Sequence, residues 1–349
     1  MTHDAIIVGS GQAGLAAAYC LKQRGIGYSV LNAGAAPHGS WPRYYDSLTL
    51  FSPAEYSSLP GMAFPGDPKR YPRRDEVTGY LEAYATQFDI NIKNGVNVVD
   101  VTKADGHFRV RDSQGNEYEA RSLVAASGSF NSPYIPDIPG RASYQGDVLH
   151  SVDYRDPGLY KGKRVVVVGA ANSAVQIAVE LAKVANVTLA ARTAVKFIPQ
   201  TFLGKDLHFW LGLSGLDIMP WLKDQSTPVL DSGEYKRALR AGKPAARKMF
   251  KEFHESGVIW DDGTKEDVDA VVFATGFRPN WDYLGSLGVT GDSAKNGDIR
   301  SGVSMRIPGL YFVGFSGQRS FSSATLRGVG RDAGFVATRI AEYLATCRG

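Results

Sequence analysis

One pattern occurs twice in this chain and restricts its fold more than any other feature: a short apolar strand, a glycine-rich turn and an apolar helix. In the first copy the strand runs from Ala5 to Val8, the turn from Gly9 to Gly14 and the helix from Leu15 to Leu21. A second strand, Tyr28 to Leu31, follows. Strand, turn, helix and strand in this order predict a βαβ unit whose turn binds a dinucleotide.

The second copy has the same order of elements. Its strand runs from Arg164 to Val168, its turn from Gly169 to Ala174 and its helix from Val175 to Lys183, and the strand Val187 to Ala190 follows. The turn keeps the first glycine but carries alanines in place of the next two. We therefore expect a second nucleotide-binding unit of similar plan.

A further repeat supports the duplication. Leu123 to Gly128 and Val271 to Gly276 each have the composition of a buried strand that ends in two small residues and a glycine. After the second of them, the chain is expected to return to the first unit through a strand, Leu310 to Val313, and an amphipathic helix, Leu326 to Tyr343. This pattern predicts an α/β fold with two Rossmann-like domains, the second inserted into the first.

The predicted domain boundaries follow from a segment dense in proline, glycine and aspartate. This segment, Asn131 to Asp156, is the expected linker. Residues 1–153 and 279–349 are assigned to the first domain, and residues 154–278 to the second. A chain of 349 residues suits two domains, at about 150 residues each.

The first turn has the glycine spacing of a dinucleotide site. Gly9 permits the tight turn, Gly11 lets a pyrophosphate approach the backbone, and Gly14 lets the helix pack closely on the strand. The helix N-terminus then offers free N–H groups to the phosphates. Asn32 stands at the end of the second strand, where a ribose-binding carboxylate is usual. Because Asn32 can hydrogen-bond a ribose but offers no cation to a 2′-phosphate, the first domain is expected to bind FAD.

The second turn predicts a different cofactor. Arg192 occupies the position that corresponds to Asn32, and Thr193 follows it. An arginine there forms paired hydrogen bonds with a 2′-phosphate, to which a threonine hydroxyl can add another. The second domain is therefore expected to bind NADPH rather than NADH. The alternative is that Arg192 is an ordinary surface cation.

Composition excludes several functions. The net charge of +4 is too small to indicate a nucleic-acid binder. Cys20 and Cys347 are far apart and form no CxxC, so neither a dithiol centre nor a metal site is expected, and two free thiols suit the cytoplasm. No stretch is long and apolar enough to span a membrane. The basic stretch Lys236 to Lys251 is expected to be a solvated helix surface broken by Pro244.

Three further motifs carry a resemblance to a known family. The segment Tyr144 to Tyr154 is similar to the FxGxxxHxxx(Y/W) fingerprint of class B flavin-dependent monooxygenases, with tyrosine in place of phenylalanine. Ala274-Thr275-Gly276 and Gly39-Ser40-Trp41 match two other elements of that family. The chain resembles in particular the short bacterial flavin-containing monooxygenases, which have two dinucleotide-binding domains.

The resemblance and the two turns together identify the expected site. The candidate catalytic residues are Phe51 and His150. Phe51 stands where many members of the family place an asparagine beside the flavin. His150 is the histidine of the fingerprint; it is expected to tie the linker to the nucleotide domain, and a direct acid/base role is the alternative. The residues expected to bind FAD or NADPH are Gly9, Ser10, Gly11, Gln12, Ala13, Gly14, Asn32, Ser40, Trp41, Val98, Ser127, Gly128, Gly169, Ala171, Asn172, Ser173, Gln176, Arg192, Thr193, Ala274, Thr275, Gly276, Gly314 and Thr325.

The resemblance also implies a reaction. NADPH would reduce the flavin, and the reduced flavin would form a C4a-hydroperoxide with O₂ that oxygenates a small sulfide, amine or ketone. Tyr154-Arg155-Asp156 in place of Trp-Pro or Trp-Asp favours oxygenation of a heteroatom over Baeyer-Villiger oxidation. Trp41 and Phe51 are candidates for excluding water from the flavin. The expected pocket lining is Phe51 to Pro65, residues 200–225 and Phe315 to Phe321.

Two alternatives to this reaction remain open. Phe51 also suits an FAD-dependent NADPH oxidase or reductase that passes electrons to oxygen or a quinone without inserting oxygen. A nucleotide-sensing protein without catalysis is the other alternative. The sequence leaves the substrate and the oligomeric state open, a homodimer being one possibility.

Overall fold

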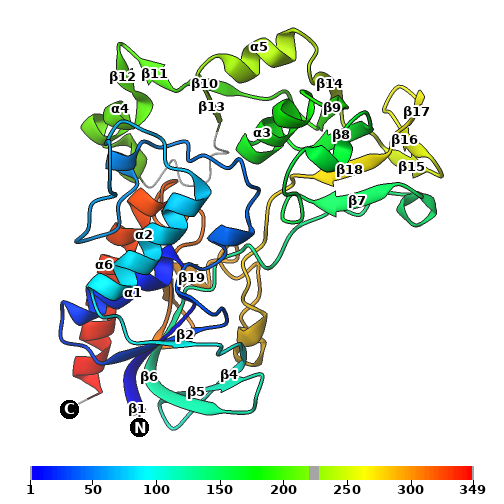
Figure 1. Cartoon of the computed structure of the whole chain (residues 1–349). Coiled ribbons are helices and arrows are strands. Elements are labelled where there is room, and N and C mark those ends of the chain that lie inside the picture. The colour runs from blue at the N-terminus through cyan, green and yellow to red at the C-terminus, as the bar shows by residue number, and fades with distance from the viewer. Residues whose placement is uncertain (1, 220–227, 348–349) are drawn as a thin grey trace.

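The computed structural model describes residues 2–219 and 228–347 and contains two main sheets with helices packed against them (Figure 1). The larger sheet has nine strands. Its five parallel strands lie in the order β3 (Ile92–Asn94), β2 (Tyr28–Asn32), β1 (Thr2–Val8), β6 (Glu117–Ala125) and β21 (Leu310–Phe312). Its four antiparallel strands are β20 (Val303–Ser304) and β19 (Ile299–Arg300), beyond β21, and β5 (His107–Asp112) and β4 (Val98–Ala104), which extend from β6.

Both faces of the larger sheet are covered, and strand β1 shows why. Successive side chains of a strand point to opposite faces. Ala5 and Ile7 accordingly pack against three helices, and Ile6 and Val8 pack in the core formed with β4, β5 and η7 (Asp282–Leu287). The three helices are α1 (Gln12–Lys22), α2 (Arg74–Gln87) and α6 (Leu326–Thr346), which lie together in Figure 1.

The smaller sheet is entirely parallel and has five strands. They lie in the order β14 (Ala245–Lys248), β9 (Asn186–Ala191), β8 (Arg164–Val168), β18 (Ala270–Phe273) and β7 (Asp147–His150). One face packs against α3 (Asn172–Leu181) and α5 (Glu234–Arg240). The other face packs against a three-stranded antiparallel sheet formed by β15 (Glu252–His254), β16 (Gly257–Ile259) and β17 (Lys265–Asp267).

The two predicted strand-turn-helix-strand units are confirmed, because β1, α1 and β2 form the first and β8, α3 and β9 the second. The smaller sheet is formed entirely by residues between β6 and β19 of the larger one. The predicted boundary at residue 153 is wrong in one respect. Strand β7 falls before that boundary but pairs in parallel with β18, so it belongs to the second sheet.

The basic stretch Lys236 to Lys251 is only partly helical. Helix α5 covers its beginning and ends at Arg240, and after Pro244 the chain forms β14, which pairs with β9 at the edge of the smaller sheet. The prediction of one broken helix surface is therefore wrong for this second half. Proline lacks the N–H that a helix interior needs, but it is tolerated just before an edge strand.

A long excursion leaves the smaller sheet after β9. It begins with β10 (Phe197–Pro199), which pairs with β13 (Val229–Asp231), and includes the hairpin of β11 (Thr201–Phe202) and β12 (Lys205–Asp206), helix α4 (Leu207–Ser214) and η5 (Leu216–Ile218). Figure 1 shows α4 away from the smaller sheet, on the side of α2 and α6. The remaining short 3₁₀ segments are η1 (Trp41–Arg43), η2 (Ala54–Tyr56), η3 (Arg141–Ser143) and η4 (Gly158–Tyr160). Within the described ranges, none of the helices is long and apolar enough to cross a bilayer.

Candidate cofactor and active site

The first turn joins β1 to α1 at very close range. Gly9 has φ +104°, and a Cβ there would lie 2.6 Å from the carbonyl oxygen of Ala126. A Cβ at Gly14 would lie 1.8 Å from the carbonyl oxygen of Gly9 itself. Real Cβ atoms do not approach that closely, so both positions require glycine for the fold alone.

Gly11 has a different environment. A Cβ there would meet only the Cα of Gly39, at an ordinary distance of 3.7 Å. Gly11 is also the N-cap of α1, and no side chain caps this helix end. The first N–H groups of the helix are thus left for another partner, which suits a phosphate. Ser10 beside it is buried, and its hydroxyl has no hydrogen-bond partner among the described residues, which also fits a site that a bound group completes.

The first turn contacts two other predicted site segments. The Trp41 indole N–H donates to Oε1 of Gln12 at 3.0 Å, and the Gln12 amide donates weakly to the carbonyl of Ala324 at 3.5 Å. On the other side, Gly314 approaches Ala13 so closely that a Cβ on the glycine would lie 2.4 Å from the alanine Cβ. The structure thus brings the predicted residues of the first turn, the 39–41 element and the end of β21 together.

Ser40 and Thr325 lie at the starts of two elements beside this turn. Ser40 precedes η1 and makes no capping hydrogen bond. Thr325 is the N-cap of α6: its hydroxyl accepts from the N–H of Gly328 at 3.2 Å and donates to the carbonyl of Ser322 at 2.6 Å. The Thr325 side chain therefore already has a structural role at the helix start.

Asn32 is where the sequence places it, at the end of β2, but its side chain is already engaged. The buried amide donates to the carbonyls of Gly34 and Ala36, both at 3.0 Å, and to Oδ1 of Asn94 at 2.8 Å. The amide N–H groups therefore hold the loop after β2, and only the oxygen of Asn32 retains capacity for a ribose hydroxyl. The expectation that Asn32 also donates to a ribose is not supported by this geometry.

Three more predicted residues lie at the edges of the larger sheet. Ser127 follows β6, and its hydroxyl donates to the carbonyl of Asn280 at 2.7 Å and lies 3.3 Å from that of Tyr283. Gly128 is exposed beside it. Val98 opens β4 and is buried in the core between the sheet and η7, so its side chain does not face solvent or a ligand.

The second turn repeats the close packing of the first. Gly169 has φ +147°, and a Cβ there would lie 2.5 Å from the carbonyl oxygen of Ala274 and 2.8 Å from the Cβ of Ala174. Ala171 is exposed at the N-cap of α3, and again no side chain caps the helix. The α3 N-terminus therefore offers free N–H groups, as α1 does.

The first turn of α3 contacts both the larger and the smaller domain, by which we mean each sheet together with the elements packed on it. Oδ1 of Asn172 accepts from the backbone N–H of Leu230 at 3.3 Å. Oε1 of Gln176 accepts from the hydroxyl of Tyr45, a residue that the larger domain sends into the core of the smaller one. Ser173 lies half-buried between them. Asn172 and Gln176 thus have structural partners as well as their predicted cofactor role.

Arg192 and Thr193 follow β9 at the carboxyl edge of the smaller sheet. Both are exposed, and in residues 2–219 and 228–347 neither has a side-chain hydrogen bond or an ion pair. A guanidinium at this edge, near the uncapped start of α3, is positioned to meet a phosphate without first breaking another contact.

His150 is buried and both of its ring nitrogens have backbone partners. Nε2 lies 3.0 Å from the carbonyl oxygen of Gly276, and Nδ1 accepts from the N–H of Val152 at 3.1 Å. Nε2 therefore carries the proton. Burial lowers the pKa of His150, so the ring is neutral. No nitrogen is free to exchange a proton with a substrate, which argues against the acid/base role and for a residue that positions the Ala274–Gly276 turn. In the same turn, Thr275 donates to the carbonyl of Tyr134.

The other fingerprint residues are also structural. The hydroxyl of Tyr144 donates to the carbonyl of Val268 at 2.9 Å, and Gly146 leaves room for that ring, since a Cβ there would lie 2.1 Å from the hydroxyl. Tyr154 is fully buried and donates to Glu180 of α3 at 2.8 Å. The fingerprint therefore fixes β7 and the chain after it onto the smaller sheet.

A continuous row of aromatic rings connects the first turn to the fingerprint. The ring centroids of Trp41 and Tyr44 are 5.5 Å apart, those of Tyr44 and Phe130 4.5 Å, and those of Phe130 and Phe277 5.2 Å. Phe277 then meets His150 edge to face at 4.9 Å. Segments from both domains contribute to this row, which is an apolar wall between the two turns.

Phe51 lies in a second aromatic cluster that the sequence did not predict. The buried ring of His208 is nearly parallel to the rings of both Phe51 and Tyr56, with centroid distances of 6.2 and 5.9 Å. Oδ1 of Asp206 lies 2.7 Å from Nδ1 of His208, and the hydroxyl of Tyr71 donates to Oδ2. Burial acts to raise the pKa of Asp206, but these hydrogen bonds outweigh it and lower that pKa. No motif indicates this cluster, because its members come from segments far apart in the chain.

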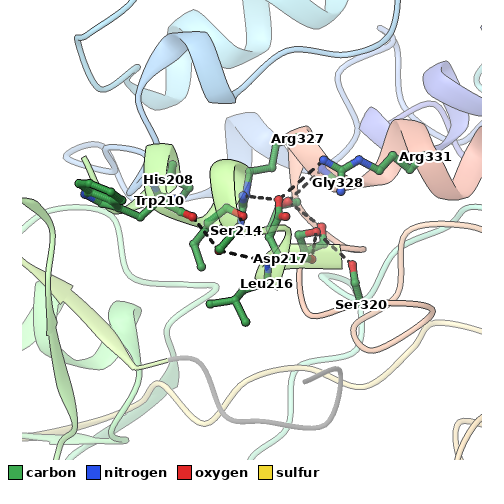
Figure 2. A network of polar contacts seen from close by, with 12 residues as sticks. His208, Trp210, Ser214, Leu216, Asp217, Ser320, Arg327, Gly328 and Arg331 are labelled. Carbon is green, nitrogen blue, oxygen red and sulfur yellow. Dashed lines mark hydrogen bonds and ion pairs between the residues drawn. The ribbon is translucent and has the colours of Figure 1, made fainter. Parts of the chain in front are cut away.

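A buried ion pair attaches the excursion to α6 (Figure 2). Oδ2 of Asp217 accepts from Nη1 of Arg327 at 2.8 Å and lies 3.8 Å from Nη2 of Arg331. The hydroxyl of Ser322 donates to the backbone carbonyl of Asp217 at 3.0 Å. Burial lowers the pKa of Arg327, whose Nε has no partner among the described residues. No sequence motif indicates this pair.

Part of the expected pocket lining borders a cavity. A cavity of about 790 Å³ is lined by Phe315 to Ser320 and by Ile218, which lies within the expected range 200–225. No residue of the range Phe51 to Pro65 lines it. Residues 220–225 lie outside the described part of the chain.

Two parallel sheets, each with a glycine-containing turn before a helix whose N-terminus no side chain caps, are typical of two-domain flavoproteins. Residues 6–314 match the family described as pyridine nucleotide-disulphide oxidoreductase, and the chain belongs to that family. Within it the chain is a class B flavin monooxygenase by its relatives. The cysteines of this sequence, Cys20 and Cys347, form no CxxC of the kind that dithiol chemistry uses, and both are free thiols.

The relatives match over almost the whole chain. A flavin-containing monooxygenase from Stenotrophomonas maltophilia is 30% identical, with a TM-score of 0.85 and coverage of 98% of this chain and 99% of that one. An uncharacterized CzcO-like oxidoreductase from Geobacillus kaustophilus is 34% identical and covers 97% of this chain and 99% of its own. The probable indole-3-pyruvate monooxygenase YUCCA3 of Arabidopsis thaliana is 32% identical, over 91% of this chain and 83% of its own.

Proposed function

We propose that the protein is an NADPH-dependent flavin monooxygenase that holds FAD at the first turn and NADPH at the second and inserts one oxygen atom of O₂ into a small sulfide, amine or ketone. The observation that carries this proposal is the pair of helix N-termini, at α1 and α3, that no side chain caps. Each follows a turn that begins with a glycine, Gly9 or Gly169, where a Cβ would lie within 2.6 Å of a backbone carbonyl oxygen. Membership of the class B flavin monooxygenases supplies the reaction type.

Each cofactor would meet a distinct set of residues. The backbone at Gly11 and the start of α1 would hold the FAD pyrophosphate, with Ser10 as a hydroxyl ligand in reach of the turn. The start of α3 would hold the NADPH pyrophosphate, and Arg192 with Thr193 would bind its 2′-phosphate. When bound, the pair supplies hydride transfer and oxygen activation, and the protein supplies placement and shielding.

Arg192 is the residue that chooses between the two nicotinamide cofactors in this proposal. Its guanidinium has no ion pair in the described part of the chain, so a 2′-phosphate gains a contact without displacing another. A second Stenotrophomonas maltophilia structure, 30% identical with a TM-score of 0.86, is of a variant in which a Gln-His pair was replaced by Arg-Thr. The same residue types stand here at Arg192 and Thr193.

The aromatic row from Trp41 to His150 supports oxygen insertion rather than simple reduction of oxygen. This row of rings would keep water from the reacting centre, and exclusion of water protects reactive intermediates from hydrolysis. His150 contributes by fixing the Ala274–Gly276 turn, not by moving a proton.

One experiment separates the proposal from its alternatives. The purified protein is reconstituted with FAD, reduced with NADPH without oxygen, and then mixed with oxygen and methyl phenyl sulfide. The proposal expects flavin bleaching on reduction and sulfoxide in proportion to the NADPH consumed. Hydrogen peroxide in that proportion with every sulfide, amine and ketone tried would favour the oxidase or reductase alternative, and NADPH binding without flavin reduction would favour the sensor.

A further inference from the structure

The cavity beside α6 has a composition that the proposed cofactors do not explain. It lies between the loop after β21, the segment 294–301 and the first turns of α6, and its volume is about 790 Å³. Phe315 in its wall directly follows Gly314, and Gly328 is three residues beyond Thr325. The cavity therefore adjoins two residues of the proposed flavin site, although neither of them lines it.

The charged residues of the cavity are mostly basic. Lys295, Arg300, Arg319 and Arg331 line it, and Asp332 is the one acidic residue in the lining. The Asp332 carboxyl is buried, lies 3.4 Å from Nη1 of Arg319, and has its pKa raised by burial. A concave surface with this excess of positive charge attracts anions.

Three of these cations remain available to a ligand. Arg300 is exposed and has no ion pair in the described ranges. Lys295 pairs only with its neighbour Asp292, and both side chains are largely exposed. Arg331 is 52% exposed and forms only a long ion pair with Asp217, at 3.8 Å. Figure 2 shows this arginine beside Asp217 on α6. Exposed pairs of this kind contribute little and yield readily to a new partner.

Apolar groups share the cavity wall with these cations. Phe315, which meets Trp281 edge to face at 5.6 Å, lies in the wall together with Ile218 and Ile299. The guanidinium of Arg319 stacks on Phe335 at 4.4 Å, which holds its position. Cations and apolar surface in one cavity suit a molecule with an acidic group and an apolar body.

We propose that this cavity binds the acidic end of the substrate, so that the preferred substrates are organic carboxylates bearing the sulfide, amine or ketone that is oxygenated. That the bound molecule is the substrate rests on the proposed monooxygenase function. That the cavity binds an organic anion rests on the cavity alone. The side chains of Arg300 and Lys295 are exposed, so they can determine charge selection without contributing to the core.

The test uses two sulfides that differ in one carboxylate: methyl phenyl sulfide and 4-(methylthio)benzoate. We expect 4-(methylthio)benzoate to have about tenfold higher kcat/KM for sulfoxide formation, because its carboxylate gains charge-assisted contacts that the other sulfide lacks. The preference should decline as salt screens the exposed cations. The double variant Lys295→Gln/Arg300→Gln should lose most of this preference through KM and leave methyl phenyl sulfide unchanged. Arg240→Gln, an exposed arginine on α5 outside the cavity, is the matched control.

Calorimetric titration of both sulfides into the FAD-loaded protein provides a readout independent of turnover. Tighter binding of 4-(methylthio)benzoate that is lost in the double variant and kept in Arg240→Gln supports anion binding by the cavity. If that result is obtained but no sulfoxide forms, the monooxygenase proposal alone fails. Equal binding of the two sulfides, or a double variant that binds the carboxylate as the unaltered protein does, overturns the inference.

Discussion

Removing the charge of Asp217 should release the excursion from the larger domain. Asp217 is 5% exposed and Arg327 10% exposed, and the atoms that pair are 2.8 Å apart. In Asp217→Asn the guanidinium of Arg327 would remain buried without a counter-charge. Breaking a buried ion pair in this way costs about 3–5 kcal/mol. Arg331 adds little to this value, because its side chain is half exposed and 3.8 Å away.

The free-energy loss applies to a local opening rather than to unfolding of the whole chain. Asp217 lies in η5 next to α4, and Arg327 is in the first turn of α6, so the pair joins the excursion to the larger domain. Since about 1.4 kcal/mol corresponds to tenfold in an equilibrium constant, a loss of about 3 kcal/mol raises the open population by roughly a hundredfold. The amides of α4 should exchange faster by that factor, or reach the rate of an unstructured chain.

Hydrogen exchange followed by mass spectrometry measures this effect segment by segment. The control is Glu342→Gln, which removes an exposed ion pair with Arg339 on the same helix α6 and should change exchange by less than about tenfold. The double variant Asp217→Leu/Arg327→Met replaces the pair with apolar side chains and should restore much of the protection. If the α4 amides of Asp217→Asn exchanged at rates within about threefold of those in the unaltered protein, the conclusion that Asp217 and Arg327 form a desolvated ion pair would be refuted.

Other expectations follow from the two turns and the fingerprint. Arg192→Ala should raise KM for NADPH by more than about tenfold and leave KM for NADH nearly unchanged, because a charge-assisted contact contributes about 1.5–3 kcal/mol; Arg164→Ala, at the opposite end of the same sheet, should change neither, and equal KM shifts for both cofactors would contradict the specificity argument. Gly14→Ala should yield protein that fails to retain FAD, seen as loss of the flavin absorbance after gel filtration, since its Cβ would lie 1.8 Å from the Gly9 carbonyl oxygen; normal flavin content would show that the turn can relax. Burial lowers the pKa of His150 from its ordinary value of 6.5, so the unfolded chain binds the proton first and the free energy of unfolding falls as the pH drops from 6.5 toward the lowered value. His150→Gln should remove this decline in urea unfolding curves. An unchanged pH dependence would assign the decline to other groups.

Local sequence was sufficient for the two nucleotide-binding units. Each unit is a strand, a turn and a helix that are contiguous in the chain, and the close contact that requires Gly14 is with Gly9 in the same turn. Gly9 is also held close to Ala126, at the end of β6, a contact that the spacing within the turn does not record. Contacts within one turn leave a direct record in the spacing of small residues. For the same reason the position of Arg192 at the end of β9 follows from the length of the repeated unit.

The sequence also located two residues whose hydrogen-bond partners it did not predict. Asn32 was expected to donate to a ribose, but three acceptors from the next loop and from β3 already take its amide. His150 was a catalytic candidate, but two backbone groups occupy its nitrogens. Position along the chain was correct in both cases, because motifs specify where a residue lies and not which neighbours the folded chain brings to its polar atoms.

Tertiary structure alone decided the contacts between the domains and the charge of the cavity. Strand β7 joined the second sheet through parallel pairing with β18, more than a hundred residues later, and Asp217 met Arg327 across a similar separation. The cavity cations come from the segment 294–301, from the loop after β21 and from α6. Side chains that meet only in the folded chain have no fixed spacing in the sequence, so the sequence does not predict these contacts. The turns and their helices are built mainly from neighbours along the backbone, and their residue spacing can therefore be recognised in the sequence.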